Sequence, residues 1–108
     1  MRLFGLKSCD TCRKALKALR AAGHDPQVID VRADGIGPAD MQAILDRFGD
    51  GAVNTRSTTW RGLSQEDRQR PAADLLATHP TLLKRPVIES GGQWHQGWTK
   101  PVEETLLG

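Results

Sequence analysis

The sequence has little of what several common classes of protein require. No stretch approaches the roughly 18 consecutive apolar residues of a transmembrane helix, and no apolar signal region precedes the first strand-like residues. The chain has 2 cysteines, too few for a disulfide framework, and they lack further ligands at the spacing of a zinc site. We therefore expect no membrane segment, no bound metal and a reducing cytoplasm as the location.

The chain also has no large excess of positive or negative charge. The formal net charge is +2, and acidic and basic residues are mixed along the whole chain. This balance gives no reason to expect direct contact with nucleic acid or a membrane. Most basic residues are arginines, whose planar guanidinium suits carboxylates and oxyanions. A length of 108 residues predicts a single domain, residues 1–108, that buries its core without disulfides.

Apolar and turn patterns predict an alternating order of elements. Residues 1–6 form a buried strand pattern, residues 10–22 an amphipathic helix that ends at Gly23, and residues 27–31 a second strand. Such a strand–helix–strand unit is parallel and right-handed.

The second half is predicted to contain two helices, a hairpin and a terminal helix. After a turn at residues 34–38 comes a helix that ends at Gly49, then a polar, irregular stretch over residues 50–66 and a short helix from Pro71 to about Thr78. The predicted hairpin has its first strand after Pro86, its turn at residues 90–92 and its second strand at residues 93–98, and Pro101 begins the last helix.

The two cysteines, Cys9 and Cys12, lie where the first strand pattern changes to the helix pattern. A C-x-x-C motif at that junction is typical of a thioredoxin-like α/β fold. A helix N-terminus stabilises a thiolate by about 0.3–1 kcal/mol, whereas half ionisation at pH 7 needs roughly 2 kcal/mol. We therefore expect nearby cations, with four candidates: Lys7, Arg13, Arg56 and Arg85.

The two cysteines are not equivalent. Cys12 lies on the same helical stripe as Leu16 and Leu19, so it should be partly buried and less acidic than Cys9. The spacing therefore predicts that Cys9 attacks. Cys12 either resolves the resulting mixed disulfide or is a small core residue.

Arg85, Pro86 and Arg56 each allow two interpretations. Pro86 precedes a strand and is either a cis-proline beside the reactive sulfur or a trans-proline that begins an edge strand. Arg85 either points into the site or is solvated. Arg56 lies in a polar stretch with several threonines, so it either helps to bind an anion or is a solvated loop residue.

Three motifs, in order, resemble the ArsC/Spx family, which includes glutaredoxin-coupled arsenate reductases. They are G-L-K-S-C-D-T-C-R-K-A, N-T-R-S-T-T-W-R-G-L and L-L-K-R-P-V-I, and they are most similar to the YffB-like branch. The resemblance covers nearly the whole chain. It implies a thioredoxin-like fold with a central mixed sheet, a helical insertion, a β-hairpin and a terminal helix.

The resemblance also implies roles for site residues. The nucleophilic cysteine matches Cys9, the anion-binding arginines match Arg56 and Arg85, and the cis-proline matches Pro86. Cys12 matches the second cysteine of the Spx-like pair. One position departs from the pattern: arsenate reductases of this kind carry a third arginine on or after the last strand, where this chain has Q-G-W-T at residues 96–99. This argues against efficient arsenate reduction.

Two functions follow from the resemblance. The first is a thiol-dependent reductase without a bound cofactor, which acts on a small thiol or oxyanion substrate, with glutathione as a co-substrate and glutaredoxin as a partner. The alternative is an Spx-like regulator that binds RNA polymerase and uses Cys9 and Cys12 as a redox switch. We favour the reductase because the central motif is YffB-like and no strongly basic surface is evident.

Overall fold

The computed structural model describes residues 1–107, which form two compact units. The first unit combines Met1–Asp34 with Arg85–Gly108, and the second is Gly35–Lys84. The expectation of a single domain stays a prediction. Within residues 1–107, every helix is too short or too polar to cross a membrane.

The first unit contains a four-stranded sheet in the order β2-β1-β3-β4. The strands are β1 (Arg2–Gly5), β2 (Gln27–Asp30), β3 (Val87–Ser90) and β4 (Gln93–Gln96). β1 pairs with β2 in parallel, whereas the β1–β3 and β3–β4 pairs are antiparallel. The sheet is therefore mixed, and the fold class agrees with the thioredoxin-like prediction. The last strand ends two residues earlier than predicted, just before Gly97, whose φ of 80° does not suit a strand.

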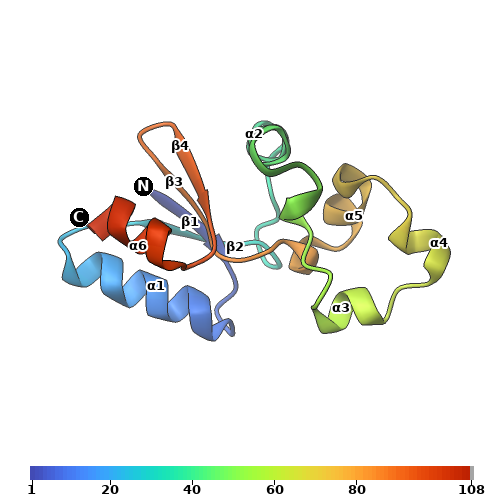
Figure 1. Ribbon diagram of the computed structural model, residues 1–108, viewed down its shortest axis with the longest axis horizontal. Coiled ribbons are helices and arrows are strands. Elements are labelled where there is room, and N and C mark those ends of the chain that lie inside the picture. The colour runs from blue at the N-terminus through green and yellow to red at the C-terminus, as the bar shows by residue number, and fades with distance from the viewer. Residues whose placement is uncertain (108) are drawn as a thin grey trace. The chain divides into compact units, whose positions relative to one another are not determined.

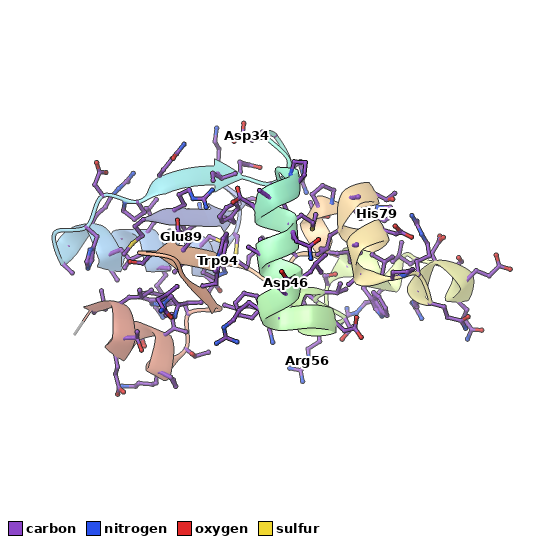
Figure 2. The ribbon with its side chains drawn as sticks, turned by 90° about the horizontal axis from the view of Figure 1, so that it is seen from above. Asp34, Asp46, Arg56, His79, Glu89 and Trp94 are labelled. Atoms are coloured by element: carbon purple, nitrogen blue, oxygen red, sulfur yellow. The ribbon has the colours of Figure 1, made fainter. Side chains whose placement is uncertain are left out.

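Successive residues of β1 face opposite sides of this sheet, as the period of a strand requires. Leu3 belongs to the core cluster on one side. Phe4 lies on the other, with its ring centroid 5.7 Å from that of Trp94. The Arg2 guanidinium covers both rings and forms an ion pair with Glu89 at 3.0 Å. Figure 2 shows Glu89 and Trp94 on the neighbouring strands β3 and β4.

Two helices cover the side of the sheet that carries Leu3: α1 (Asp10–Ala21) and α6 (Lys100–Leu107) (Figure 1). The buried cluster between them and the sheet consists of Leu3, Cys12, Ala15, Leu19, Ile88 and Leu106. The His24 ring lies 3.0 Å from the carbonyl oxygen of Leu106, which joins the segment after α1 to the end of α6. Cys12 is therefore part of the hydrophobic core of the first unit.

The second unit is helical. Its elements are α2 (Pro38–Phe48), η1 (Gly49–Ala52), α3 (Thr58–Arg61), α4 (Gln65–Arg68), α5 (Ala72–Thr78) and η2 (Pro80–Leu82), where η marks a 3-10 helix. The prediction that residues 50–66 are irregular is wrong. Ser57 caps α3 by accepting the N–H of Trp60 at 3.2 Å, and Ser64 caps α4 in the same way through Asp67 at 3.1 Å. One-turn helices have no apolar periodicity, so only these caps mark them in the sequence.

Candidate active site

Cys9 is the N-cap residue of α1. Its backbone is extended, with φ −83° and ψ 115°, and its Sγ accepts the N–H of Cys12 at 3.4 Å. The Cys9 N–H donates to the carbonyl oxygen of Leu6 at 3.1 Å, which holds the turn that leads from β1 into the helix. The half-buried sulfur therefore lies at the positive end of the α1 dipole, where a thiolate is stabilised.

Arg85 supplies the positive charge beside this sulfur. Burial by itself raises the pKa of Cys9, but hydrogen bonds from the side chain and backbone of Cys12 and the hydrogen bond and charge of Arg85 outweigh it. The net result is a Cys9 pKa below its ordinary value. This direction agrees with the expectation that the helix end needs a nearby cation.

The two cations closest to Cys9 in the sequence, Lys7 and Arg13, each interact with a carboxylate. Arg13 forms an ion pair with Asp10, one turn earlier on α1. The pKa of Asp30 is lowered, chiefly by the backbone N–H of Ala33, and the charge of Lys7 adds to that shift. Of the candidates within the first unit, the structure therefore assigns the cation beside Cys9 to Arg85.

Cys12 has the opposite environment. Its side chain is 4% exposed, and burial, together with the hydrogen bond and charge of Cys9, raises its pKa to about 12. The pair thus contains one easily ionised sulfur and one that stays protonated near neutral pH. This difference in pKa agrees with the prediction from the spacing that Cys12 is less acidic than Cys9.

Gly5 is a site residue that sequence reasoning missed. A Cβ at this position would lie 2.6 Å from the Sγ of Cys12, closer than real Cβ atoms approach other atoms, and 3.1 Å from its Cβ, which is also tight. Only glycine therefore allows α1 to bring Cys12 this close to β1. The signal was present, because a lone glycine within an apolar strand pattern often marks a close approach.

The Arg85–Pro86 peptide bond is cis, as the family resemblance implies, and not the alternative trans bond. Pro86 is buried, and its carbonyl oxygen accepts the N–H of Gly97 at 2.8 Å. This bond connects the start of β3 to the residue after β4. The segment that carries Arg85 is therefore held by the hairpin.

Arg56 belongs to the second unit. It is exposed, and its backbone N–H donates to the Asn54 Oδ1 at 3.0 Å. Figure 2 shows its side chain extending outward. The structure thus brings Cys9, Cys12 and Arg85 together in the first unit. The anion-binding role of Arg56 stays a prediction.

The sheet order, the cis-proline before β3 and a cysteine pair at the first strand–helix junction define a class, the thioredoxin-like proteins with a dithiol site. The sequence matches the ArsC family over residues 4–103, and the chain belongs to that family. This confirms the family resemblance that the three motifs carried.

Known proteins similar to this chain lead to the same family. An uncharacterized protein of Haemophilus influenzae is 38% identical over 96 residues, which cover 84% of each chain. Among solved structures, a YffB protein has a TM-score of 0.89 at 28% identity and covers 98% of this chain and 97% of its own. An arsenate reductase (ArsC) related protein from Brucella melitensis has a TM-score of 0.73 at 28% identity, with 97% and 93% covered.

Proposed function

We propose that this protein is a thiol-dependent reductase, with the Cys9 thiolate as nucleophile and glutathione as the reducing co-substrate. One observation carries the proposal: a half-buried sulfur at a helix N-terminus, with the Arg85 guanidinium beside it and a lowered pKa. A thiolate of this kind is the species that attacks disulfides and oxidised substrate atoms.

Relatives support reduction as the general chemistry. The Brucella melitensis protein is named as related to arsenate reductase, and a possible arsenate reductase from Streptococcus mutans is 26% identical with a TM-score of 0.78, covering 96% of this chain and 95% of its own. This chain has no arginine at residues 96–99. We therefore favour a disulfide that contains a small thiol over arsenate as the substrate.

In the first step, the Cys9 thiolate attacks one sulfur of the substrate disulfide. A bond forms between Cys9 Sγ and that sulfur, the substrate S–S bond breaks, and the second substrate sulfur leaves as a thiolate and takes a proton. Arg85 stabilises the negative charge on Cys9 before the attack. In this proposal, Arg85 in the first unit and Arg56 in the second are each anion-binding residues, and the backbone of Pro86 contacts the substrate.

In the second step, Cys12 or a glutathione thiolate attacks Cys9 Sγ and releases the remaining substrate thiol. Apart from burial, the hydrogen bond and charge of Cys9 raise the pKa of Cys12. Both contributions disappear once Cys9 is a neutral mixed disulfide, so Cys12 becomes easier to ionise at the point where it would react. If Cys12 resolves, two glutathiones then reduce the Cys9–Cys12 disulfide and leave as glutathione disulfide. If glutathione resolves, Cys9 is left as a mixed disulfide with glutathione, and a second glutathione attacks the glutathione sulfur, frees the Cys9 thiolate and leaves as glutathione disulfide. Either route consumes two glutathiones, which supply the two electrons transferred.

The test is a turnover assay with glutathione and model disulfides, with arsenate as a separate substrate. We expect Cys9→Ser to lower turnover by more than about 10³-fold, because the nucleophile is lost. Cys12→Ser separates the two routes: activity that persists with added glutathione indicates a monothiol cycle, and activity that disappears indicates resolution by Cys12. Full activity of Cys9→Ser would refute the proposal.

A second candidate is the Spx-like regulator that binds RNA polymerase. It is favoured by the hydrogen bond between the Cys9 and Cys12 side chains, because two thiols this close can be oxidised to a disulfide that acts as a switch. Capture of RNA polymerase by the oxidised protein but not by the reduced protein, without any turnover, would favour it. A reducing cytoplasm suits both candidates and stays a prediction, as does a partnership with glutaredoxin.

A further inference from the structure

We propose that Lys84 and Arg56 form a pocket in the second unit that binds a carboxylate of a small thiol such as glutathione. This inference rests on the proposed reductase function and names the group that the second unit recognises. Arg56 was expected to bind an anion, whereas Lys84 carries no role in the resemblance. Both residues lie in the second unit and line one cavity of about 350 Å³, together with Val53, Asn54 and Thr55.

Backbone pairing places Lys84 at this cavity. Val53 and Leu83 form an antiparallel bridge. On either side of it, the Lys84 N–H donates to the Ala52 carbonyl oxygen at 2.8 Å and the Asn54 N–H donates to the Leu82 carbonyl oxygen at 2.7 Å. Three consecutive residues are thus paired with residues 82–84, so the backbone of Lys84 has a defined position beside the cavity.

A turn centred on Asn54 brings Arg56 to the same cavity. The Asn54 Oδ1 accepts the N–H of Arg56 at 3.0 Å, and its carbonyl oxygen accepts the Ser57 Oγ at 2.9 Å. These bonds turn the chain out of its pairing with residues 82–84 immediately after Asn54. Arg56 therefore lines the same cavity as Lys84 instead of continuing along the paired strand.

The lining of this cavity fits an anion. It offers two positive charges, the Asn54 amide and the Thr55 hydroxyl, and it contains no carboxylate among the residues that the structure describes there. A guanidinium can hold a carboxylate through two parallel N–H bonds, and an ammonium adds a point charge beside it. Lys84 thus adds a positive charge to the anion-binding residues of a chain that lacks the third arginine at residues 96–99.

We commit to a carboxylate because a tripeptide thiol such as glutathione carries two of them. The probe is S-methylglutathione, which keeps both carboxylates and cannot form a disulfide. Its binding to the full-length reduced protein is measured by calorimetry or by amide chemical shifts. We expect Lys84→Gln to raise the Kd about three- to tenfold, since charge-assisted hydrogen bonds at exposed sites are partly screened by water and salt.

Two controls isolate the charge of this pocket. Lys17→Gln removes one positive charge from an exposed position of α1 in the other unit, and it should leave the Kd unchanged. The diethyl ester of S-methylglutathione lacks both carboxylates, and it should bind weakly and equally to wild type and Lys84→Gln. Sulfate, added at constant ionic strength, tests for a tetrahedral oxyanion instead.

Three results would overturn the inference: an unchanged Kd in Lys84→Gln, an equal loss in Lys17→Gln, or a loss of sulfate binding without a loss of S-methylglutathione binding. The proposed reductase function is judged separately, through Cys9-dependent turnover with an uncharged thiol such as dithiothreitol. If the protein shows Cys9-dependent turnover but Lys84→Gln binds S-methylglutathione as well as wild type does, the proposed reductase function stands and the proposed pocket is wrong.

Discussion

The two compact units differ in what holds their functional residues. In the first, a regular sheet and amphipathic helices bury Cys12 and leave Cys9 at the end of α1. In the second, short capped helices and a turn at Asn54 position the exposed Arg56. Thiol chemistry therefore depends on close packing, whereas the proposed anion binding depends on a few local hydrogen bonds.

The difference matters because packing and capping respond to mutation on different scales. A clash in a filled core affects everything that packs around it, and removal of one cap loosens only one turn. Matched substitutions in the two units should therefore distinguish the effect of core packing from the effect of local capping.

The largest effect is expected at Gly5. Gly5→Ala places a methyl group 2.6 Å from the Cys12 Sγ, and overpacking of this kind lowers the free energy of unfolding by about 1–3 kcal/mol. Gly51→Ala is the matched control in the second unit, because a Cβ there meets no atom within 4 Å and its φ is not positive. We expect that variant to change stability by less than about 0.5 kcal/mol.

Denaturant unfolding of both variants measures this contrast. A second measurement, the rate at which the Cys9–Cys12 disulfide forms under a glutathione buffer, should fall in Gly5→Ala because Cys12 must move away from β1. Equal stability losses in Gly5→Ala and Gly51→Ala would contradict the view that the first unit is the one controlled by packing.

A smaller effect is expected at Arg85. Arg85→Gln removes a hydrogen bond and a charge that lower the pKa of Cys9, so the pKa should rise. Alkylation of Cys9 by iodoacetamide at a pH below both pKa values should then slow severalfold, because a smaller fraction of Cys9 is thiolate. The greater nucleophilicity of the less acidic thiolate offsets only part of this loss.

The pH profile gives the sign of this effect. Below both pKa values wild type should react faster, because more of its Cys9 is ionised. Well above them both proteins are fully ionised, and the variant should react at least as fast. Arg85→Lys, which keeps the charge, should restore part of the wild-type rate at pH 7. A pH profile that does not shift in Arg85→Gln would show that Arg85 does not stabilise the Cys9 thiolate.

The smallest effect is expected at Ser57, which caps α3 and also donates its hydroxyl hydrogen to the Asn54 carbonyl oxygen. Ser57→Ala should destabilise this turn by about 1 kcal/mol. Hydrogen exchange of the Trp60 amide should accelerate, while amides of β1 keep their protection. Thr58→Ala, at the exposed neighbouring position, is the control. Faster exchange in β1 as well would show that the units do not respond separately.

Much of the first unit could be predicted from the sequence. The buried strand pattern of residues 1–6, the apolar stripe of residues 10–22 and the glycine pair at 91–92 each give a pattern or turn signal, and each element lies within a residue or two of its predicted place. The one-turn helices α3 and α4 could not be found in this way, because four residues are too few to repeat an apolar pattern.

The sequence by itself determined the family, through the resemblance of its three motifs, and that resemblance implied the mixed sheet. Local spacing determined the order of the α and β elements and the chemical inequality of the two cysteines. Only the tertiary structure decided that Arg85, distant from Cys9 along the chain, lies beside its sulfur, and that Gly5 makes room for Cys12. The reason is physical: periodicity encodes which face a residue presents, but the partner it meets across that face depends on how separate segments pack.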